Sequence, residues 1–569
     1  MVSSILYVAV IGFHHKRGCQ IEYCYPPLIG DEGELPAAWQ NLPSLALPDG
    51  AHNVDHDIIY FLLPSLDDPN RSVFGISCYR QISAKDLLNK STDVTRSTVQ
   101  KSVCVLSRVP LFGVLTAKLE LITKAYFNER DFAKRRKEVL IIKSLIFHYS
   151  TQFEVDVLSQ MYENLCEMFP DVETEEQVAV MDISVQSLLT TFRHRVLVLF
   201  KLLLLEKKIV FYISPVFQLG QLMIALISLF PQLVEKGLFH AAAYNPNTSK
   251  CWNDDKSVDK DKIVSEVNED IFKDRILEFR DNIAVNVNIE KKNKVSGNSP
   301  IEFVHKNFLV SAVDCTSETQ LSNSSSVESC SNLKQKQILD TDSYGFPLSI
   351  FTKGSLFHPY LSICHLDMIR SDKTRAYCIG TTNALFVQRR DLLDVIVTID
   401  EVGDGSIDIL DIELKRSLAL TAADLRFVDF VLKEIEANAK SPSWEGSDDW
   451  IRLQMQAYLL SLIATVRADL KNSLDDFNEA FIAEWKMSNN YRIWSCGDYP
   501  DLASTVPGHP FAGGLSISDV LLRMEHSAGG MGSGRRVASA VVNTSKYFAD
   551  TGTKVKTSIS AWLKGTRQA

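Results

Sequence analysis

FRHRVLVLFKLLLLEKKIVFYISPVFQLGQLMIALISLFPQL, residues 192–233, decides the fold of this chain because it admits two incompatible interpretations. Residues 209–233 carry no charged side chain, and these 25 residues exceed the roughly 20 that a helix needs to span a bilayer. The first interpretation is therefore a single-pass membrane protein anchored at 209–233.

The internal pattern of the same stretch favours the middle of a soluble α/β sheet. Residues 209–213 form a β-branched and aromatic run, the composition of a buried strand. Ser214-Pro215 ends that run, because proline lacks an N–H and biases the residue before it away from helix. Apolar residues then recur at helical spacing, and an earlier apolar helix, 196–205, ends at Glu206-Lys207-Lys208. We therefore expect helix, charged turn, strand, Ser-Pro turn and helix.

Composition bounds the class of protein. The 569 residues leave room for about three or four domains, with 46% hydrophobic and 23% charged residues, as in globular proteins. A net charge of -10 argues against a general nucleic-acid binder, which would present a basic face. The 11 cysteines contain no C-x-x-C pair, which indicates reduced thiols in the cytosol. No basic residue precedes the apolar run 5–13, so this run lacks the layout of a signal peptide.

The first part of the chain is rich in strand patterns. A helix follows from about residue 112, with Leu115, Leu119, Leu121 and Ile122 on its apolar side. Strands first and a helix after indicate an α+β sheet domain that ends near residue 130. The predicted strands are 4–13, 20–25, 57–63, 72–79 and 102–106.

The rest of the chain alternates between helical, biased and sheet-like segments. Residues 128–190 are helical, and the basic-then-apolar segment 135–150 fits poorly with its surroundings. Residues 250–342 are first highly charged and then serine-rich, which predicts a disordered insertion that cannot bury enough apolar area. The later candidate strands are 347–351, 377–380, 385–387 and 395–399, and the later helices are 450–466 and about 475–486.

No pattern in the sequence indicates a catalytic centre. H-E-x-x-H and G-x-S-x-G are absent, and clustered metal ligands are not evident. His14-His15 with Cys19 and Cys24 lack a second ligand pair at zinc-site spacing and are interpreted as turn residues. In GGMGSGRR, 529–536, two arginines replace the Lys and Ser/Thr of a phosphate loop, which favours a hinge. We expect no metal, no cofactor and no bond-making chemistry.

The basic tail has two interpretations that the sequence leaves open. From Arg535 onward there are seven Lys or Arg and one acid, and the apolar residues fall on one helical stripe. This pattern is typical of an interfacial helix on anionic membranes, with each basic residue adding about 1 kcal/mol. The alternative is a disordered basic tail, which glycines at 534, 552 and 565 favour. The candidate membrane contacts are Arg535, Arg536, Phe548, Lys554, Lys556, Trp562 and Leu563.

Several blocks of sequence resemble one known family. They cover most of residues 5–240 and 344–530, and they are similar to the late secretory pathway proteins of the Avl-nine family, part of the tripartite DENN-module group. The blocks are LALPDGAHN (45–53), VFGISCYRQI (73–82), TVQKSVCVLSRVPLFG (98–113), LEKKIVFYISPV (205–216), YGFPLSIFTKG (344–354), GTTNALF (380–386), TAADLRFVDF (421–430) and WEGSDDWIR (444–452).

The resemblance implies a multidomain fold of α/β and α+β type. A longin-like sheet domain is expected first, then a central α/β DENN sheet domain and a helical C-terminal DENN domain. The implied divisions are 1–130 for the longin-like domain, 131–190 for a helical connector with an insertion at 135–152, 191–249 with 343–400 for the central domain, 250–342 for the disordered insertion, 401–500 for the helical domain, and 501–569 for the basic amphipathic tail.

The resemblance also implies a role. DENN modules bind Rab GTPases, and many accelerate GDP release, which requires no nucleophile because the Rab switch segments are held in another conformation. The Avl-nine family implies late secretory and recycling-endosome transport, cell migration in animals, and a cytoplasmic protein peripherally bound to late Golgi, secretory-vesicle or recycling-endosome membranes. The alternatives are a DENN-fold scaffold without exchange activity and the membrane-anchored protein described above.

The resemblance does not identify which individual residues contact a Rab. Arg80 and Arg426 lie in matching blocks and suit either a structural or a Rab-contacting role. Asn383, in GTTN, is expected to close a turn, because Gly, Thr and Asn suit tight turns.

Overall fold

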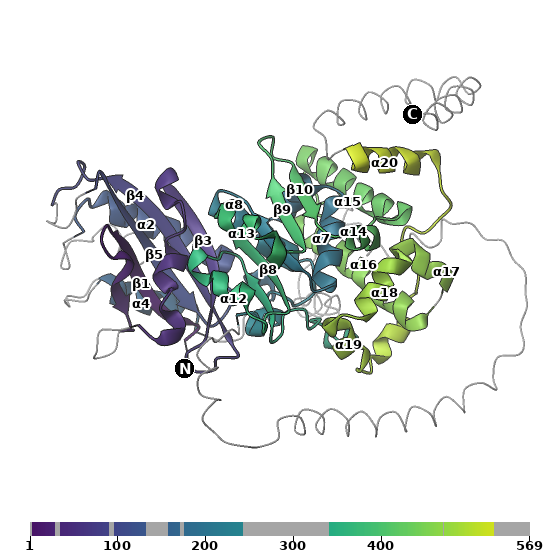
Figure 1. Ribbon diagram of the computed structural model, residues 1–569, viewed down its shortest axis with the longest axis horizontal. Coiled ribbons are helices and arrows are strands. Elements are labelled where there is room, and N and C mark those ends of the chain that lie inside the picture. The colour runs from purple at the N-terminus through teal and green to yellow at the C-terminus, as the bar shows by residue number, and fades with distance from the viewer. Residues whose placement is uncertain are drawn as a thin grey trace, which may run out of the picture. The chain divides into compact units, whose positions relative to one another are not determined.

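Two five-stranded sheets organise the described part of the chain (Figure 1). The structure, a computed structural model, describes residues 3–28, 35–89, 96–132, 157–170, 176–242, 341–469 and 471–528. All of these residues belong to one compact unit.

The N-terminal sheet is antiparallel, with strand order β2-β1-β5-β4-β3. All five strands predicted from the sequence are confirmed, and β5 is longer than predicted at both ends. Helices α1 (Leu42–Ala46) and α2 (Phe112–Asn128) pack on this sheet, as does α4 (Val157–Met168). The strands are β1 (Ile5–His14), β2 (Gly18–Tyr25), β3 (His56–Pro64), β4 (Ser72–Ser83) and β5 (Thr98–Ser107).

Helix α2 buries a narrower face than predicted. Leu115 and Leu119 are buried, but Leu121 is 56% exposed, so its placement on the apolar side was wrong. The reason is geometric: successive residues advance about 100° around a helix, so Leu121 points away from the face that Leu119 occupies.

The central sheet has strand order β10-β9-β6-β8-β7. Its first four strands in the chain are parallel, and the last is antiparallel to its neighbour. The strands are β6 (Lys208–Tyr212), β7 (Ser355–His358), β8 (Ala376–Thr381), β9 (Val395–Ile399) and β10 (Gly405–Ile409).

Residues 192–233 fold as helix, strand, turn and helix. Helix α7 (Arg195–Leu204) precedes β6, and α8 (Val216–Ile227) follows it, so the sheet interpretation is confirmed. The membrane anchor at 209–233 was wrong, because β6 hydrogen-bonds to β8 and β9 on its two sides. In the described residues, no helix is both long and apolar enough to cross a membrane.

Two predicted strands of the central sheet were also wrong. Residues 347–351 are irregular, although Leu348, Ile350 and Phe351 are buried. Residues 385–387 lie in helix α13 (Ala384–Gln388), because the Asn383 side chain accepts the Leu385 N–H and caps the helix. The predicted strands 377–380 and 395–399 are confirmed as parts of β8 and β9.

Helices dominate the remainder of the described chain. The predicted helix 450–466 is confirmed within α16, whereas 475–486 is interrupted at Asn478, whose φ is 74°. The further α-helices are α5 (Glu176–Ala179), α6 (Val185–Phe192), α12 (Leu366–Arg370), α14 (Ile412–Ser417), α15 (Ala422–Lys440), α16 (Asp448–Ala468), α17 (Lys471–Leu474), α18 (Glu479–Lys486), α19 (Asn489–Ser495) and α20 (Ile517–Ala528). Short 3-10 turns cover Ala37–Trp39, Ala51–Asn53, Gly237–His240, Thr341–Tyr344, Ile363–His365, Arg390–Leu392, Asp475–Phe477 and Pro500–Ser504.

The two faces of the central sheet have different cores. One face, with α7 and α8, joins the N-terminal sheet and the C-terminal helices in a continuous apolar core. The other face carries a smaller core that includes residues of α12 and α13. Helix α8 approaches β3 closely at Gly220, where a Cβ would lie 2.9 Å from Cδ2 of Tyr60. A side chain at position 220 would therefore push the N-terminal sheet away.

Some predictions concern residues that the structure does not describe. The proposed insertion at 135–152 lies outside the described residues. Residues 250–340 of the proposed insertion at 250–342 lie outside them too. The phosphate-loop-like segment 529–536 and the candidate membrane contacts Arg535, Arg536, Phe548, Lys554, Lys556, Trp562 and Leu563 are outside them as well. The domain divisions remain predictions.

Candidate functional site

The carboxyl ends of β6 and β8 are the first place to look for a site. Ligands of open α/β sheets bind where neighbouring strands are followed by connections on opposite faces. Here β6 is followed by α8, which lies in the large core, and β8 is followed by α13, which lies in the small one. The structural question is what occupies this edge.

Asp57 of β3 occupies the end of β6. Its carboxylate accepts the N–H groups of Val216 (2.9 Å) and Phe217 (2.8 Å), the first residues of α8. It also accepts the N–H of Ile58 at 2.9 Å. Burial raises the pKa of Asp57, and these N–H donors oppose that rise. A side chain of the N-terminal sheet therefore caps a helix of the central sheet.

Asp49 occupies the end of β8 in a similar way. Its carboxylate accepts hydrogen bonds from Ser362 Oγ (3.2 Å), the Ile363 N–H (3.0 Å) and Asn383 Nδ2 (3.2 Å). Its own N–H donates to the Tyr360 hydroxyl at 2.7 Å. Asn383 closes a turn, as predicted, and it also binds Asp49, which sequence reasoning missed.

We call this set the N-terminal junction: Asp49, Asp57, Tyr360, Ser362 and Asn383. Doubly wound sheets bind small ligands at this edge. Here two carboxylates of the chain itself, those of Asp49 and Asp57, occupy it. The hydrogen bonds given above all come from neutral donors. These bonds therefore fasten the two sheets without an ion pair.

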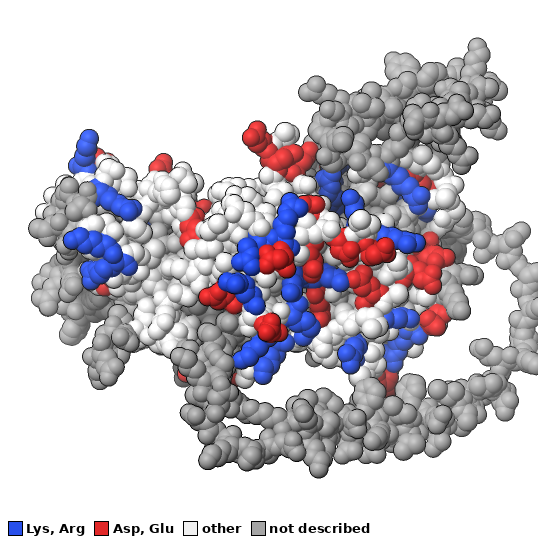
Figure 2. All heavy atoms as spheres, in the orientation of Figure 1, with Lys and Arg blue, Asp and Glu red and all other residues white. Residues whose placement is uncertain are grey.

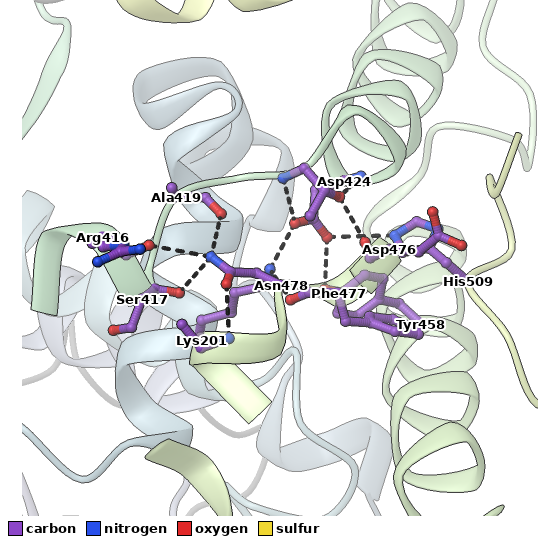
Figure 3. Close-up of polar contacts among 12 residues, drawn as sticks. Lys201, Arg416, Ser417, Ala419, Asp424, Tyr458, Asp476, Phe477, Asn478 and His509 are labelled. Atoms are coloured by element: carbon purple, nitrogen blue, oxygen red, sulfur yellow. Dashed lines mark hydrogen bonds and ion pairs between the residues drawn. The ribbon is translucent and has the colours of Figure 1, made fainter. Parts of the chain in front are cut away.

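A second polar cluster lies between α7 and the C-terminal helices (Figure 3). Lys201 Nζ lies 2.6 Å from Asp424 Oδ2, and both side chains have an exposed fraction of 0%. Asp424 also accepts the Tyr458 hydroxyl at 2.9 Å, and His509 Nε2 lies 3.4 Å from Asp424 Oδ1. We call these four residues, Lys201, Asp424, Tyr458 and His509, the C-terminal junction.

Burial and charge act in opposite directions on the pKa values of this junction. Burial alone would raise the pKa of Asp424, but the charge of Lys201, the nearby His509 ring and the hydrogen bond from Lys201 bring it below its ordinary value. Burial lowers the pKa of His509, although Asp424 opposes that shift. Burial and the neighbouring Asp424 raise the pKa of Tyr458 well above its ordinary value. At neutral pH we therefore assign an ionised Asp424 and a neutral Tyr458.

Lysine, aspartate, tyrosine and histidine are groups that enzymes use, but their setting here is structural. Lys201 donates a second bond to the Phe477 carbonyl at 3.2 Å, and its side chain is fully buried. The Thr421 N–H donates to Asp424 at 3.0 Å within the capping box that starts α15. In this conformation no substrate reaches either charge, so the cluster holds α7 against α15 and α16.

The charged turn predicted at Glu206-Lys207-Lys208 has a related role. The Glu206 side chain accepts the Asn490 N–H (2.8 Å) at the start of α19 and Arg375 Nη2 (3.1 Å) before β8. Lys207 pairs with Glu484 of α18 at 2.6 Å. The turn therefore links the central sheet to two C-terminal helices.

The two arginines weighed as Rab contacts make contacts within the chain. Arg426 pairs with Asp519 at 2.8 Å and donates to the carbonyls of Phe511 (2.5 Å) and Gly513 (3.2 Å). This contact holds the segment that leads into α20 on α15. Arg80 of β4 lies 3.9 Å from Glu120 of α2. Both arginines therefore have partners within the chain, and the Rab-contacting role stays a prediction.

The histidine and cysteine residues weighed as zinc ligands lie at the β1–β2 turn and along β2. The rings of His14 and His15 stack with centroids 4.8 Å apart. Burial raises the pKa of Cys19 to about 11 and of Cys24 to about 12. Over the described ranges, no group of three or more His, Cys, Asp or Glu side chains has the geometry to hold a metal ion.

These features define a class of protein: a two-sheet α/β chain whose buried polar clusters join its parts. Comparison with known families makes this specific. A sequence model of the family described as "Transport protein Avl9" matches residues 5–466, and the chain belongs to that family. The resemblance seen in the sequence is thereby confirmed.

Two curated proteins show the same similarity. The chain is 28% identical over 528 residues to "Late secretory pathway protein avl9" of Schizosaccharomyces pombe, covering 89% of this chain and 90% of that protein. It is also 28% identical over 541 residues to "Late secretory pathway protein AVL9" of Saccharomyces cerevisiae, covering 86% of this chain and 58% of that protein.

Proposed function

We propose that this chain is a DENN-type membrane-trafficking factor that acts in late secretory, exocytic and recycling-endosome transport by binding a Rab GTPase. The observation that carries the proposal is the family match over residues 5–466, which spans both sheets, the N-terminal junction, and Lys201, Asp424 and Tyr458 of the C-terminal junction. The names of the two relatives place those proteins in the late secretory pathway. In animals the proposed role extends to cell migration.

The proposed mechanism is a shift of conformational populations in the Rab. An exchange factor lowers GDP affinity by holding the switch segments away from Mg²⁺ and phosphate, so it needs a rigid binding surface and no nucleophile. The N-terminal junction fastens one sheet to the other through Asp49 and Asp57, which supports such a rigid surface. The buried Lys201–Asp424 pair adds the C-terminal helices to the same body.

We further propose that the protein is cytoplasmic and binds peripherally to late Golgi, secretory-vesicle or recycling-endosome membranes. The basic residues and Trp562-Leu563 of the tail supply the contact by sequence pattern. Replacing Trp562 and Leu563 with Asp should detach the chain from anionic liposomes in a flotation assay. Unchanged flotation would remove the tail from the membrane contact.

Exchange activity is tested by fluorescent-GDP release from a panel of purified Rabs, with and without the full chain. We expect at least tenfold faster release from one or two Rabs, since a factor of ten needs only about 1.4 kcal/mol of differential binding. EDTA-treated Rab sets the maximal rate, and circular dichroism shows that the chain is folded. A Rab that binds the chain without faster release would instead indicate a non-exchanging scaffold.

A further inference from the structure

Strand β10 ends the central sheet on an unpaired edge. Within the described residues β10 pairs with β9 alone, through an antiparallel register from Gly405 opposite Ile399 to Ile409 opposite Val395. The Asp400 N–H donates to the Asp404 carbonyl and the Leu410 N–H to the Asp394 carbonyl, each at 3.0 Å. The main-chain N–H and C=O groups of successive residues point alternately to the two sides of a strand. The groups of Gly405, Ile407 and Ile409 therefore point away from β9, toward the unpaired edge.

Part of that edge is already closed. Arg195 Nη1 donates to the Gly405 carbonyl at 2.8 Å. The main-chain groups of Ile407 and Ile409 receive no partner on this edge from the described residues. Both side chains are half-buried against the large core, so the edge is an ordered template for another strand.

The segment that contains β10 and the turns on either side of it is acidic. Residues 399–414 contain six Asp or Glu and no Lys or Arg. Figure 2 shows acidic side chains gathered at the end of the hairpin of β9 and β10. Asp408 lies on β10 itself and pairs only loosely with Arg390, at 3.7 Å, and both side chains are more than half exposed. A strand that added here would be favoured by basic residues.

The described part of the chain ends near this edge, at the last residue of α20. Helix α20 is held on α15 by the Arg426–Asp519 pair and ends at Ala528. Near that end the ring of His526 lies 6.1 Å from the ring of His194. His194 precedes Arg195, the residue that binds Gly405 at the start of β10. The end of α20 and the start of β10 therefore contact two residues that are adjacent in the chain, His194 and Arg195.

The residues that follow α20 have the composition that this edge requires. Residues 529–534, GGMGSG, separate Ala528 from Arg535 and reach at most roughly 21 Å when extended. Residues 535–543, RRVASAVVN, begin with two arginines and contain three valines, which favour strands. With Val537 and Val541 on the side of Ile407 and Ile409, Arg536 falls on the side of Asp408.

We propose that residues 535–543 of the chain add to the free edge of β10 as a further strand of the central sheet. This contact and the proposed membrane contact use the same Arg535 and Arg536, so each excludes the other. The tail is then withheld from membranes until the acidic surface releases it. The inference stands independently of Rab binding.

Amide hydrogen exchange of Ile407 and Ile409 in the full chain tests the proposal. We expect both amides to exchange at least tenfold more slowly in the wild type than in R535E/R536E. The matched control K554E/K556E changes the same charge in the same tail outside 535–543, and it should keep the protection. Raising the salt to about 0.5 M should weaken the protection, because ionic screening reduces the attraction.

A charge swap separates docking from misfolding. E401K/D408K spares Asp400 and Asp411, which hold a turn and cap α14, and it should lose the protection. Combining it with R535E/R536E should restore protection to within about threefold of the wild type, since opposite charges face each other again. Equal exchange in the wild type and R535E/R536E would overturn the proposal. Protection that instead rises with protein concentration would assign the edge to a second copy and overturn it as well.

Discussion

The two junctions fasten the same central sheet by different chemistry. At the N-terminal junction, Asp49 and Asp57 accept several hydrogen bonds from neutral donors spread over two loops and a helix start. At the C-terminal junction, one lysine and one aspartate with no exposed area carry the contact. The first distributes its energy over many weak bonds, whereas the second concentrates it in one pair. A single substitution should therefore damage the second far more.

The largest expected effect is at the C-terminal junction. Lys201→Met leaves Asp424 buried without its cation, which costs about 3–5 kcal/mol in the free energy of unfolding. The measurement is urea unfolding followed by circular dichroism. The double variant K201M/D424L removes both charges and should recover at least half of the loss. A loss below about 1 kcal/mol for K201M would show that the pair is not what holds α7 to α15.

The next effect is a pH dependence at His358, two residues before Tyr360 of the N-terminal junction. Burial lowers the pKa of His358, on β7 close to the Leu62 carbonyl, to about 3. The unfolded state then binds more protons below the ordinary histidine value, so stability is full above about pH 6.5 and falls with decreasing pH. The pKa of Asp424 is lowered in the folded state, so its contribution to stability is lost only as the pH falls below about 3.9, the ordinary pKa of an aspartate.

His358→Leu should therefore flatten the acid side of the stability profile. Between pH 7 and 5 the variant should lose roughly 2 kcal/mol less than the wild type, at about 1.4 kcal/mol per pH unit for one proton. Urea unfolding at the two pH values measures this difference. His52→Leu, at an exposed histidine, is the matched control. Parallel profiles for the wild type and H358L would refute the assignment.

A smaller effect is expected at the N-terminal junction. Asp57→Ala leaves the N–H groups of Val216 and Phe217 without their acceptor and should cost about 1–3 kcal/mol. Asp67→Ala removes an exposed acid paired with Arg108 and should cost at most about 0.5 kcal/mol. Thermal unfolding of the two variants side by side is sufficient. Equal melting temperatures would mean that α8 does not depend on this cap.

The smallest effect is local. Asp49→Ala should cost about 1 kcal/mol, because two of its donors, Ile363 and Asn383, are only partly buried and water can replace the carboxylate there. The Ile363 amide, which donates to Asp49, should exchange about tenfold faster, while the amides of β6 should not change. If the β6 amides also exchange faster, the N-terminal junction is as cooperative as the C-terminal one, and the contrast drawn above fails.

The sequence predicted one sheet better than the other, for physical reasons. The N-terminal strands are long and rich in β-branched, aromatic and other apolar residues, so their composition identifies them. In the central sheet, β7 has only four residues and β10, GSIDI, contains Gly and Asp, so neither stood out. The apolar run 347–351 was taken for a strand because burial alone does not distinguish a strand from a buried irregular segment.

The junctions were harder to predict than the strands. Asn383 was expected to close a turn, and it does, but its bond to Asp49 joins residues 334 positions apart in the chain. Lys201 was the available signal for the C-terminal junction, because it is the one charged residue of the otherwise apolar run 196–205. A lysine in that setting requires a buried acid, yet only the tertiary fold identifies Asp424 as the partner.

We propose that this member of the Avl9 family acts through a Rab. The most direct measurement is equilibrium binding of the folded full chain to each Rab of a panel in nucleotide-free, GDP-bound and GTP-bound forms. We expect one or a few Rabs to bind at least tenfold more tightly in the nucleotide-free or GDP-bound form than in the GTP-bound form. Binding no stronger than background for every Rab would contradict it.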